Sequence, residues 1–309
     1  MKILVAPLNW GLGHASRCVP LVQRLLDEGN EVILSGDGDS LTLLRKHFPK
    51  LRYVYLAPLN LRYSAGQRQV WAMLKAFPKL FRWALQDHAM LKAILREEKI
   101  DRVISDNRFG LYSEQTECIY ITHQLYIMLP KGWRWAEPIA SRIHARIYAH
   151  YNKVWVPDYE AVEKSLAGEL SHTGAAVEYI GPLSRFAPVD KKGSFEVVAV
   201  LSGLEPHRSL LEKEILARYR DSEERVLVVQ GLMSRPNTRI KRGNMTIVPY
   251  MNDAELVPAL LGASRIIARS GYSTIMDLKA LGVMDKAELI PTPGQPEQEY
   301  LATLHNKNH

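Results

Sequence analysis

The sequence predicts an α/β fold of two domains, each built on a parallel sheet covered by helices. Three observations support this prediction. The chain has 309 residues, and a domain takes about 150 residues on average. Short apolar runs alternate with longer amphipathic stretches, as in a parallel sheet with crossover helices. The alternation restarts near residue 196, after a segment of turn-forming residues. A cleft between the two domains is therefore expected.

The first series of elements starts at the beginning of the chain. Its expected strands are short and apolar, and lie at 2–6, 31–35, 102–105, 118–122 and 154–157, with a helix at about 15–29. Residues 62–102 hold nine Lys/Arg and four Asp/Glu and show helical apolar spacing. Pro78 inside that segment must open a new helix or kink it. Residues 131–153 hold five basic residues and one acid among aromatic side chains. Both segments are predicted to be basic, aromatic helices.

The second series is preceded by a linker. Residues 181–193 combine Gly, Pro and charges without a strand or helix period, which places the domain boundary between 187 and 188. The domains are then 1–187 and 188–309. The expected strands of the second domain lie at 196–201, 225–230, 245–248, 265–268 and 288–291, and its expected helices at about 209–219, 253–262 and 273–282.

Composition and charge narrow the classes of function. With 47% hydrophobic and 24% charged residues, the chain is neither disordered nor fibrous. The net charge of +7 divides into +6 for residues 1–187 and +1 for 188–309. The basic half indicates an anionic partner, either membrane headgroups, nucleic acid or a phosphorylated substrate. No base-reading motif is recognisable, so nucleic acid is not expected.

The location that the sequence predicts is the cytosol. No window approaches the roughly 18 apolar residues of a membrane span, and the first residues lack the features of a signal peptide. Cys18 and Cys118 fit neither a disulfide framework nor a zinc site. They are expected to be small buried residues in a reducing compartment.

The first candidate site follows the first strand. Gly11 and Gly13 would let the backbone approach a ligand, and the helix that follows offers free N–H groups to an anion. The motif is not Gly-x-Gly-x-x-Gly, so a nicotinamide dehydrogenase is poorly supported. His14 is either a locally bonded helix-start residue or a general base, because imidazole titrates near neutral pH. Asp106 follows a strand at the same sheet edge, and either orients His14 or caps a helix.

The second candidate site is the more specific one. Residues 268–278 predict a strand, then a glycine, then a helix that opens with Ser and Thr and carries an acid one turn in. Such a helix start binds phosphate, and the acid can accept hydrogen bonds from sugar hydroxyls. Residues 290–302 follow with a Pro-ended strand and a segment rich in Gln and Glu.

This second motif resembles the signature of the GT-B nucleotide-sugar glycosyltransferases. It is similar in particular to the family 28-like group that includes the peptidoglycan enzyme transferring N-acetylglucosamine to lipid I. The family pattern is Gly-x-x-Thr-x-x-Glu on a helix, then a strand ending in Pro, then a Gln-containing loop ending in Ala. Here it reads Gly271, Thr274 and Asp277, with Asp in place of Glu. The resemblance implies two Rossmann-like domains facing a cleft.

Weaker matches extend the resemblance over most of the chain. The loop ending in His14 looks like the family's acceptor-side glycine loop, and Thr122-His123-Gln124 resembles its His-Glu-Gln-Asn segment with two departures. Gly181 to Arg185 is similar to a linker whose arginine binds the donor diphosphate. Ser202-Gly203 falls at the second glycine-rich loop, and residues 250–253 match the loop that reads the uracil edge.

The resemblance implies inverting transfer of a sugar from a UDP-sugar to a hydroxyl acceptor, in the hexosyltransferase class, usually without a metal. The UDP-sugar is a co-substrate, and no cofactor is expected. The implied catalytic residues are His14 as base and Asp106 as its orienter. The implied donor-binding residues are Arg185, Ser202, Gly203, Met251, Gly271, Ser273, Thr274, Asp277, Gln295, Glu297 and Gln298. The implied acceptor-side residues are Gly11, Gly13, His123 and Gln124.

Several alternatives stay open. Arg185 could form only a linker salt bridge, Thr274 could only cap a helix, and residues 295–298 could be a solvated loop. The acceptor is expected to be lipid-linked or close to an anionic membrane surface, with the protein peripheral on its inner face, unless the basic helices are ordinary solvated faces. A hydrolase of the same fold also pairs a Gly-x-Gly-His loop with Arg-Cys, here Arg17-Cys18. A non-catalytic nucleotide-sugar-binding protein is the third alternative.

The end of the chain carries one further expectation. Family members continue after the Gln-containing segment with a strand and closing helices, whereas this chain ends at His309, seven residues past Ala302. The closing helices are therefore expected to be missing, and the second domain to be incomplete. Weakened domain closure and low activity would follow.

Overall fold

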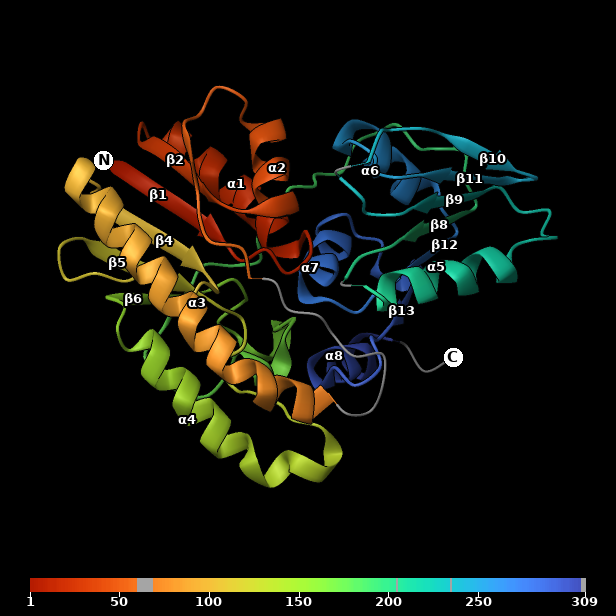
Figure 1. Cartoon of the computed structure of the whole chain (residues 1–309). Helices are drawn as coiled ribbons and strands as arrows, with labels where there is room; N and C mark the ends of the chain where they lie inside the picture. Colours follow the sequence, from red (N-terminus) through yellow and green to blue (C-terminus); the bar gives the residue numbers. More distant parts are fainter. Residues whose placement is uncertain (60–68, 204, 234, 307–309) are drawn as a thin grey trace. The chain divides into compact units, whose positions relative to one another are not determined.

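Two series of strands and helices form two compact units in the computed structural model, which describes residues 1–59, 69–203, 205–233 and 235–306 (Figure 1). The first unit takes most of the chain up to Leu183. The second takes the chain from Ser184 onward, together with Gly11–Gly13. The units divide four residues before the boundary expected from the sequence.

The first unit contains an all-parallel sheet, sheet A, with the strand order β3-β2-β1-β4-β5-β6-β7. Its strands are β1 (Lys2–Pro7), β2 (Glu31–Gly36), β3 (Tyr53–Tyr55), β4 (Arg102–Asp106), β5 (Glu117–Ile121), β6 (Lys153–Val156) and β7 (Glu178–Tyr179). Its helices are α1 (Gly13–Asp27), α2 (Gly38–His47), α3 (Gln69–Glu97) and α4 (Glu137–Tyr148). Short 3-10 turns lie at Lys131–Ala136, Val162–Lys164 and Gly168–Leu170.

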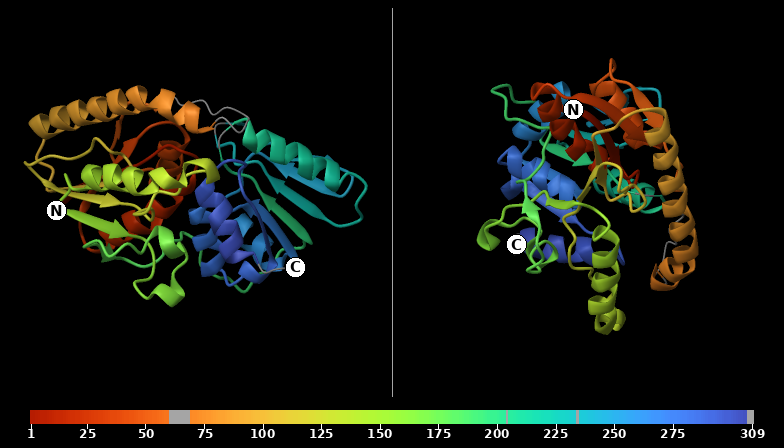
Figure 2. Two further views of the ribbon diagram at one scale, coloured as in Figure 1. Left: turned by 90° about the horizontal axis from the view of Figure 1, so that it is seen from below. Right: turned by 90° about the vertical axis from the view of Figure 1, so that its left-hand side faces the viewer.

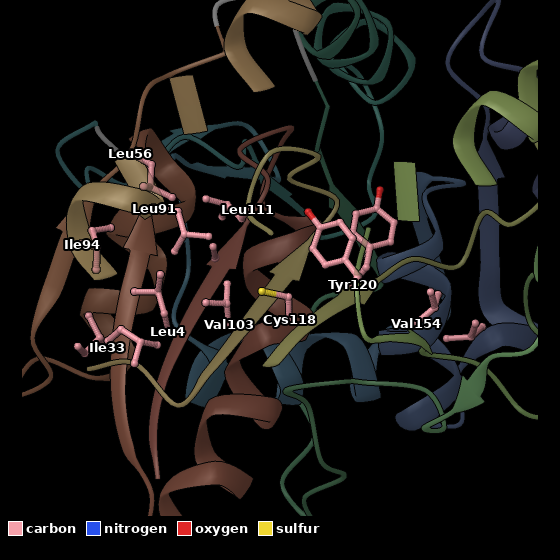
Figure 3. Close-up of a cluster of buried hydrophobic side chains, with 14 of the residues drawn as sticks. Leu4, Ile33, Leu56, Leu91, Ile94, Val103, Leu111, Cys118, Tyr120 and Val154 are labelled. Carbon is pink, nitrogen blue, oxygen red and sulfur yellow. The ribbon is translucent and has the colours of Figure 1, made fainter. Parts of the chain in front are cut away.

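Apolar side chains pack between sheet A and α3. Leu91 and Ile94 of α3 contact a cluster that includes Leu4 of β1, Val103 of β4 and Tyr120 of β5, all buried (Figure 3). Figure 2 shows α3 and α4 over one face of this sheet. Alternate residues of β1 point to opposite faces of the sheet, so Ile3 and Val5, both fully buried, belong to the other side. Sheet A is therefore covered on both faces, as a parallel sheet requires.

The second unit contains sheet B, with the strand order β10-β11-β9-β8-β12-β13. All neighbours in it are parallel except β10 and β11. Its strands are β8 (Val197–Val200), β9 (Val226–Val229), β10 (Ile240–Arg242), β11 (Met245–Val248), β12 (Arg265–Arg269) and β13 (Ala287–Ile290). Its helices are α5 (His207–Arg218), α6 (Asp253–Gly262), α7 (Tyr272–Ala280) and α8 (Pro296–His305), with a 3-10 turn at Met284–Lys286.

The structure confirms the predicted α/β fold with two parallel sheets, and corrects several elements. A single helix, α3, runs through Pro78, so this proline does not open a new helix. Residues 62–68 of the predicted basic helix lie outside the described residues. The segment from Lys131 begins with a 3-10 turn, and its helix ends at Tyr148. No helix among the described residues is long and apolar enough to cross a membrane.

Candidate functional site

The first candidate site lies at the carboxyl edge of sheet A, where the strand order reverses between β1 and β4. Pro7, the last residue of β1, is in register with Asp106, the last residue of β4. Helix α1 begins at Gly13, six residues after β1 ends. Ligands of open α/β sheets bind at such reversal points. The strand order therefore places His14 and Asp106 at one position of the sheet edge.

His14 and Asp106 are in contact, as the parallel strands predict. His14 Nδ1 lies 2.9 Å from Asp106 Oδ1, and 14% of the histidine side chain is exposed, while the carboxylate is fully buried. Arg17 completes the group. Its Nε donates to Asp106 Oδ2 at 2.7 Å, and its Nη2 donates to Asp106 Oδ1. The carboxylate is therefore held by a side-on pair of N–H donors as well as by the histidine.

The charges around Asp106 keep it ionised. Burial raises the pKa of this carboxyl, but the positive charge and hydrogen bonds of Arg17 and the contact with His14 outweigh it. The net result is a pKa well below the usual range for aspartate. Asp106 is thus an acceptor for hydrogen bonds at every physiological pH, which is the state that orients a histidine. The helix-cap interpretation of Asp106 accounts for none of these contacts.

The acceptor-side residues divide into backbone and side-chain positions. Gly11 has a φ of +80°, so a side chain there would be strained. Gly13 is the first residue of α1. His123 follows β5 and is buried, and its Nδ1 lies 3.3 Å from Arg17 Nη1. The backbone N–H of Gln124 donates to Thr122 Oγ1 at 3.1 Å. His123 therefore joins the His14 group, whereas the Gln124 backbone N–H is engaged by Thr122.

A second group of buried ion pairs, centred on Arg108, lies in the first unit. Arg108 is fully buried and donates to Asp87 of α3 through Nε and Nη2, at 2.9 and 2.8 Å, and to Asp37 Oδ2 at 2.8 Å. Asn9 Nδ2 donates to the other oxygen of Asp37 at 2.8 Å. Both carboxylate oxygens of Asp37 are therefore engaged by the protein itself. This occupancy argues against Asp37 as the ribose-binding acid of a dehydrogenase.

The second candidate site lies at the carboxyl edge of sheet B, where the strand order reverses between β8 and β12. Ser202 and Gly203 follow β8, and Gly203 has a φ of +98°. Gly271 follows β12 and is the N-cap residue of α7, without a side-chain cap. Ser273 and Thr274 therefore lie in the first turn of α7, where backbone N–H groups have no partner inside the helix. The cap interpretation of Thr274 does not apply, because the cap is Gly271.

Two predicted donor-binding residues contact the linker region. Asp277 of α7 accepts a hydrogen bond from Ser184 Oγ at 2.6 Å. Arg185 Nη2 lies 3.2 Å from Asp253 Oδ1 at the start of α6, and its guanidinium lies over the Phe186 ring at 4.8 Å. Arg185 Nε is buried without a hydrogen-bond partner among the described residues. Arg185 thus forms the salt bridge that the alternative interpretation predicted. Its Nε–H is not used by that salt bridge.

The expected loop at 295–298 is helical, which corrects the sequence interpretation. Helix α8 begins at Pro296, after Gln295. Proline is favoured at the first position of a helix, because its missing N–H needs no partner there. Gln298 Oε1 accepts from the Thr292 N–H at 2.9 Å, and its Nε2 donates to Gln295 Oε1 at 2.6 Å. Gln298 therefore holds the segment that precedes its own helix. Glu297 lies in the first turn of α8.

The remaining predicted donor residue is Met251, which lies in the loop between β11 and α6. Asn252 caps α6, with its side chain accepting from the Glu255 N–H at 2.9 Å. The loop backbone at Met251 is therefore fixed on its carboxyl side by a capped helix. The structure is compatible with base reading by the backbone here, and the role stays a prediction.

Sequence reasoning gave no role to Arg269, although its position is unusual. Arg269 is 4% exposed and donates to carbonyl oxygens of Pro291 at 2.9 Å and His207 at 2.8 Å. Its Nε, and Nε2 of the buried His207, have no hydrogen-bond partner among the described residues. Burial lowers the pKa of the Arg269 guanidinium below its ordinary value. A charge at the end of an apolar strand, two residues before a glycine, was the signal available in the sequence.

The sequence analysis named Arg17 only in the hydrolase motif and gave it no role in the transferase site. The sequence signal was its position three residues after His14, which places the two on one face of a helix. Only the contacts of Arg17 with Asp106 and His123 show that this face is buried. The structure thus adds one arginine to each candidate site.

Comparisons with known proteins agree with the fold and with the motif. The chain has the GT-B fold of glycosyltransferases. No protein-family model matches it. It is 23% identical over 330 residues to a protein named "Uncharacterized glycosyltransferase" from Methanosarcina acetivorans, covering 98% of this chain and 83% of the relative. Among solved structures it is similar to the glycotransferase of kitacinnamycin, with a TM-score of 0.60 and 14% identity over 98% of this chain and 83% of the other.

A second solved structure is similar to this chain as well. It is the spinosyn rhamnosyltransferase complexed with thymidine diphosphate, with a TM-score of 0.59 and 14% identity, covering 98% of this chain and 84% of that one. The resemblance to glycosyltransferases that the sequence motif indicated is thereby confirmed. The comparisons support glycosyltransferase activity.

Proposed function

We propose that this chain is an inverting, metal-independent glycosyltransferase of the hexosyltransferase class, which transfers a sugar from a UDP-sugar to a hydroxyl acceptor. The observation that carries the proposal is the contact of His14 with the buried, ionised Asp106 at the reversal point of sheet A. The glycine-capped start of α7 at the reversal point of sheet B supports the donor half of the proposal. The names and folds of the similar proteins support the class of reaction.

The reaction needs a base on one side of the sugar and positive charge on the other. In the proposed mechanism, His14 Nε2 takes the proton of the acceptor hydroxyl as that oxygen attacks the anomeric carbon. The bond from that carbon to the diphosphate oxygen breaks on the opposite face, so the configuration inverts and UDP leaves. The first-turn N–H groups of α7 and the Arg185 guanidinium stabilise the charge on the departing diphosphate.

The other residues bind rather than react. We propose that Ser202, Gly203 and Gly271 allow close backbone approach to the diphosphate, and that Ser273 and Thr274 donate to it. Asp277 would accept from the ribose, in exchange for or beside Ser184. Gln295 and Glu297 at the start of α8 would contact the sugar, with Gln298 holding the Gln295 side chain and the Thr292 backbone. No resident cofactor enters this scheme.

Binding of the donor is tested by thermal unfolding of the full chain with UDP, GDP, dTDP and their sugars. A ligand at 100 times its dissociation constant adds about 2.7 kcal/mol to the free energy of unfolding. The proposal predicts the largest shift with UDP and a UDP-sugar. A larger shift with dTDP, the nucleotide in one similar structure, would change the base assignment. No shift with any nucleotide would overturn the proposal.

Release of UDP separates the transferase from its alternatives. A transferase releases UDP faster when a hydroxyl acceptor is added, whereas a hydrolase releases it without an acceptor. If a UDP-sugar stabilises the chain against thermal unfolding but UDP is never released, the chain is a non-catalytic binding protein. The hydrolase remains the second candidate because the His14-Ala-Ser-Arg17-Cys18 sequence matches the hydrolase motif.

We further propose that the acceptor is lipid-linked and that the first unit binds an anionic membrane, on the inner face and from the cytoplasm. The support is a surface of α4 and the turn before it, here called the α4 surface. Trp135, Ile139 and Ile143 follow each other at four-residue spacing and are 70%, 51% and 41% exposed. Arg134, Arg142 and Arg146 are exposed beside them. Apolar side chains flanked by arginines match the interface of an anionic bilayer.

Helix α3 offers the same combination. Phe81 and Leu85 are 60% and 53% exposed, with Lys79 and Arg82 exposed next to them. We expect the full chain to float with vesicles containing anionic lipid at low salt, and less so at high salt. Trp135→Ser with Ile139→Ser should weaken flotation, whereas Leu210→Ser, an equally exposed residue of the second unit, should not. Flotation that ignores lipid charge would contradict the proposal.

A further inference from the structure

Arg269 is the last residue of β12 and lies where the strand order of sheet B reverses. Only 4% of this residue is exposed. Its Nη1 donates to the carbonyl oxygen of Pro291 at 2.9 Å, and its Nη2 donates to that of His207 at 2.8 Å. One guanidinium therefore links the end of β12 to the first residue of α5 and to the residue that follows β13.

The next residue, Ser270, extends this link to α8. Ser270 is fully buried, and its Oγ donates to the carbonyl oxygen of Gln298 at 2.7 Å. The Gln298 side chain in turn accepts from the Thr292 N–H at 2.9 Å. The two residues at the end of β12 thus hold the segment between β13 and α8, and they directly precede the glycine that caps α7.

Stability alone does not account for an arginine at this position. The hydrogen bonds of Arg269 involve no carboxylate among the described residues. Burial lowers the pKa of its guanidinium, and the charge of Glu214 on α5 offsets that effect only in part. Arg269 Nε and His207 Nε2 are buried without a hydrogen-bond partner in the part of the chain that the structure describes. Such groups reduce stability, and an apolar residue of similar volume avoids that cost.

The two segments that Arg269 links follow β8 and β13, which are the neighbours of β12 in sheet B. The segment after β8 carries Ser202 and Gly203, the proposed contacts of the diphosphate. The segment after β13 carries Gln295 and Glu297, the proposed contacts of the sugar. Arg269 thus lies between the segments that would bind the two parts of a sugar diphosphate.

We propose that Arg269 and Ser270 are positioning residues that set the spacing between the diphosphate segment and the sugar segment of the donor site. Their role toward a donor rests on the proposed function, whereas the hydrogen bonds to the two segments do not. A guanidinium donates in two directions from one rigid plane. The carbonyl oxygens of His207 and Pro291 are therefore held at a fixed separation. A ligand that contacts both segments depends on this separation more than a ligand that contacts one.

Arg269→Lys tests this role, because a lysine ammonium on its flexible stem does not replace the planar fork. The ligands for calorimetry with the full chain are uridine, UDP and the UDP-sugar that gives the largest thermal shift. We expect affinity to fall about 10-fold or more for the UDP-sugar, about threefold for UDP and less than about twofold for uridine. Arg265→Lys, at an exposed position at the start of the same strand, should change none of the three. Equal losses for all three ligands, or no loss for the UDP-sugar, would overturn the proposal.

The link itself is measured without any ligand. Hydrogen–deuterium exchange of the ligand-free full chain should be faster in Arg269→Lys at 207–214 and at 292–299, while β9 and β11 exchange as in the unmodified chain. Unchanged exchange in both segments would overturn the proposal, because no link would then have been lost. An increase spread evenly over sheet B would also overturn it, since Arg269 would then act only on overall stability.

If Arg269→Lys does not fold, Ser270→Ala provides the second variant, because it removes only the bond to Gln298. We expect an affinity for the UDP-sugar that is about three- to 10-fold lower, with the affinity for UDP unchanged, because the segment after β8 keeps its bond to Arg269. Equal losses for UDP and the UDP-sugar would count against the proposal.

One further outcome separates this inference from the proposed function. If exchange in the ligand-free chain changes as expected but no nucleotide binds to the unmodified chain, the link between the two segments stands and the proposed function fails. If nucleotides bind and sugar is transferred but the exchange and the affinities do not change in Arg269→Lys, the proposed function stands and the positioning role fails.

Discussion

Buried arginines at the edges of sheet A and sheet B have different hydrogen-bond partners. In the first unit, Arg17 and Arg108 are each paired with buried carboxylates, Asp106 for one and Asp37 with Asp87 for the other. In the second unit, the hydrogen bonds of Arg269 go to carbonyl oxygens. Buried charges are costly unless they are compensated. Arg208 of the second unit is also paired, with Glu205 and Glu212. The comparison indicates that the first edge is a closed scaffold of compensated charges, whereas the second edge keeps in Arg269 a guanidinium without a carboxylate in its hydrogen bonds among the described residues.

The largest expected effect lies at the first edge. His14→Gln removes the proposed base and should reduce the turnover number by about 10²- to 10⁴-fold, with little change in the affinity for UDP, because the diphosphate contacts are proposed in the second unit. Steady-state kinetics and calorimetry measure the two quantities. His150→Gln, an exposed histidine after α4, is the control. Unchanged turnover in His14→Gln would refute the base role.

The closed character of the first edge is tested by removing Arg108. Arg108→Met leaves Asp37 and Asp87 buried without their partner, and breaking such a group costs about 3–5 kcal/mol of unfolding free energy. Arg102→Met breaks the partly exposed pair between Arg102 of β4 and Glu117 of β5, and should cost about 1 kcal/mol or less. Urea unfolding measures both. Equal losses would mean that the Arg108 group is no more than a surface pair.

A buried carboxylate of the first unit also predicts acid sensitivity. Asp158 accepts hydrogen bonds from Ser165, Ser171 and three backbone N–H groups. Burial raises the pKa of this carboxyl, but those bonds outweigh it and lower the pKa below its ordinary 3.8. Its stabilising effect is therefore complete above the unfolded-state pKa and is lost as the pH falls through the folded-state pKa.

The measurement is unfolding free energy at pH 7, 5 and 3. Asp158→Asn should lose about 1.5–3 kcal/mol at pH 7, the range for hydrogen bonds to a charged group. It should also show a shallower decline below about pH 4 than the unmodified chain. Asp190→Asn, at an exposed position of the linker, should follow the unmodified chain. A parallel decline in Asp158→Asn would show that this carboxylate does not contribute.

The smallest expected effect tests the open character of the second edge. Arg185→Met removes one proposed diphosphate contact, and should raise the dissociation constant of UDP about 10-fold, equal to about 1.4 kcal/mol. The affinity for uridine should not change, because uridine has no phosphate. Arg220→Met, an exposed arginine after α5, is the control. Equal weakening of UDP and uridine would mean that Arg185 acts only through its pair with Asp253.

The strands were predictable because buried apolar runs in a parallel sheet leave a clear pattern. Met245–Val248 is the same in prediction and structure, and β1 differs by one residue. The missed strands are short and more exposed, such as β10 at Ile240–Arg242, whose three residues are all exposed. Hydrophobic periodicity cannot detect a strand without a buried face. Helix α8 was missed because Pro293, Gly294 and Pro296 indicate a turn, although proline also favours a helix start.

The contacts of the site that follow from the order of the strands were predictable from the sequence. His14 and Asp106 follow parallel strands, and adjacent parallel strands end at the same edge, so their contact followed from the strand order. Arg17 was not predictable, since an arginine on an amphipathic helix is normally exposed. The use of Gln298 within its own segment depends on the turn at Pro293-Gly294, which the residue types alone do not determine.

The central claim is that the donor nucleotide binds the edge of sheet B in the second unit. Hydrogen–deuterium exchange of the full chain, with and without saturating UDP, tests it most directly. We predict slower exchange at the start of α7, at 202–203 and around Met251, with sheet A unchanged. Slower exchange confined to the first unit, or no change in either unit, would contradict the claim.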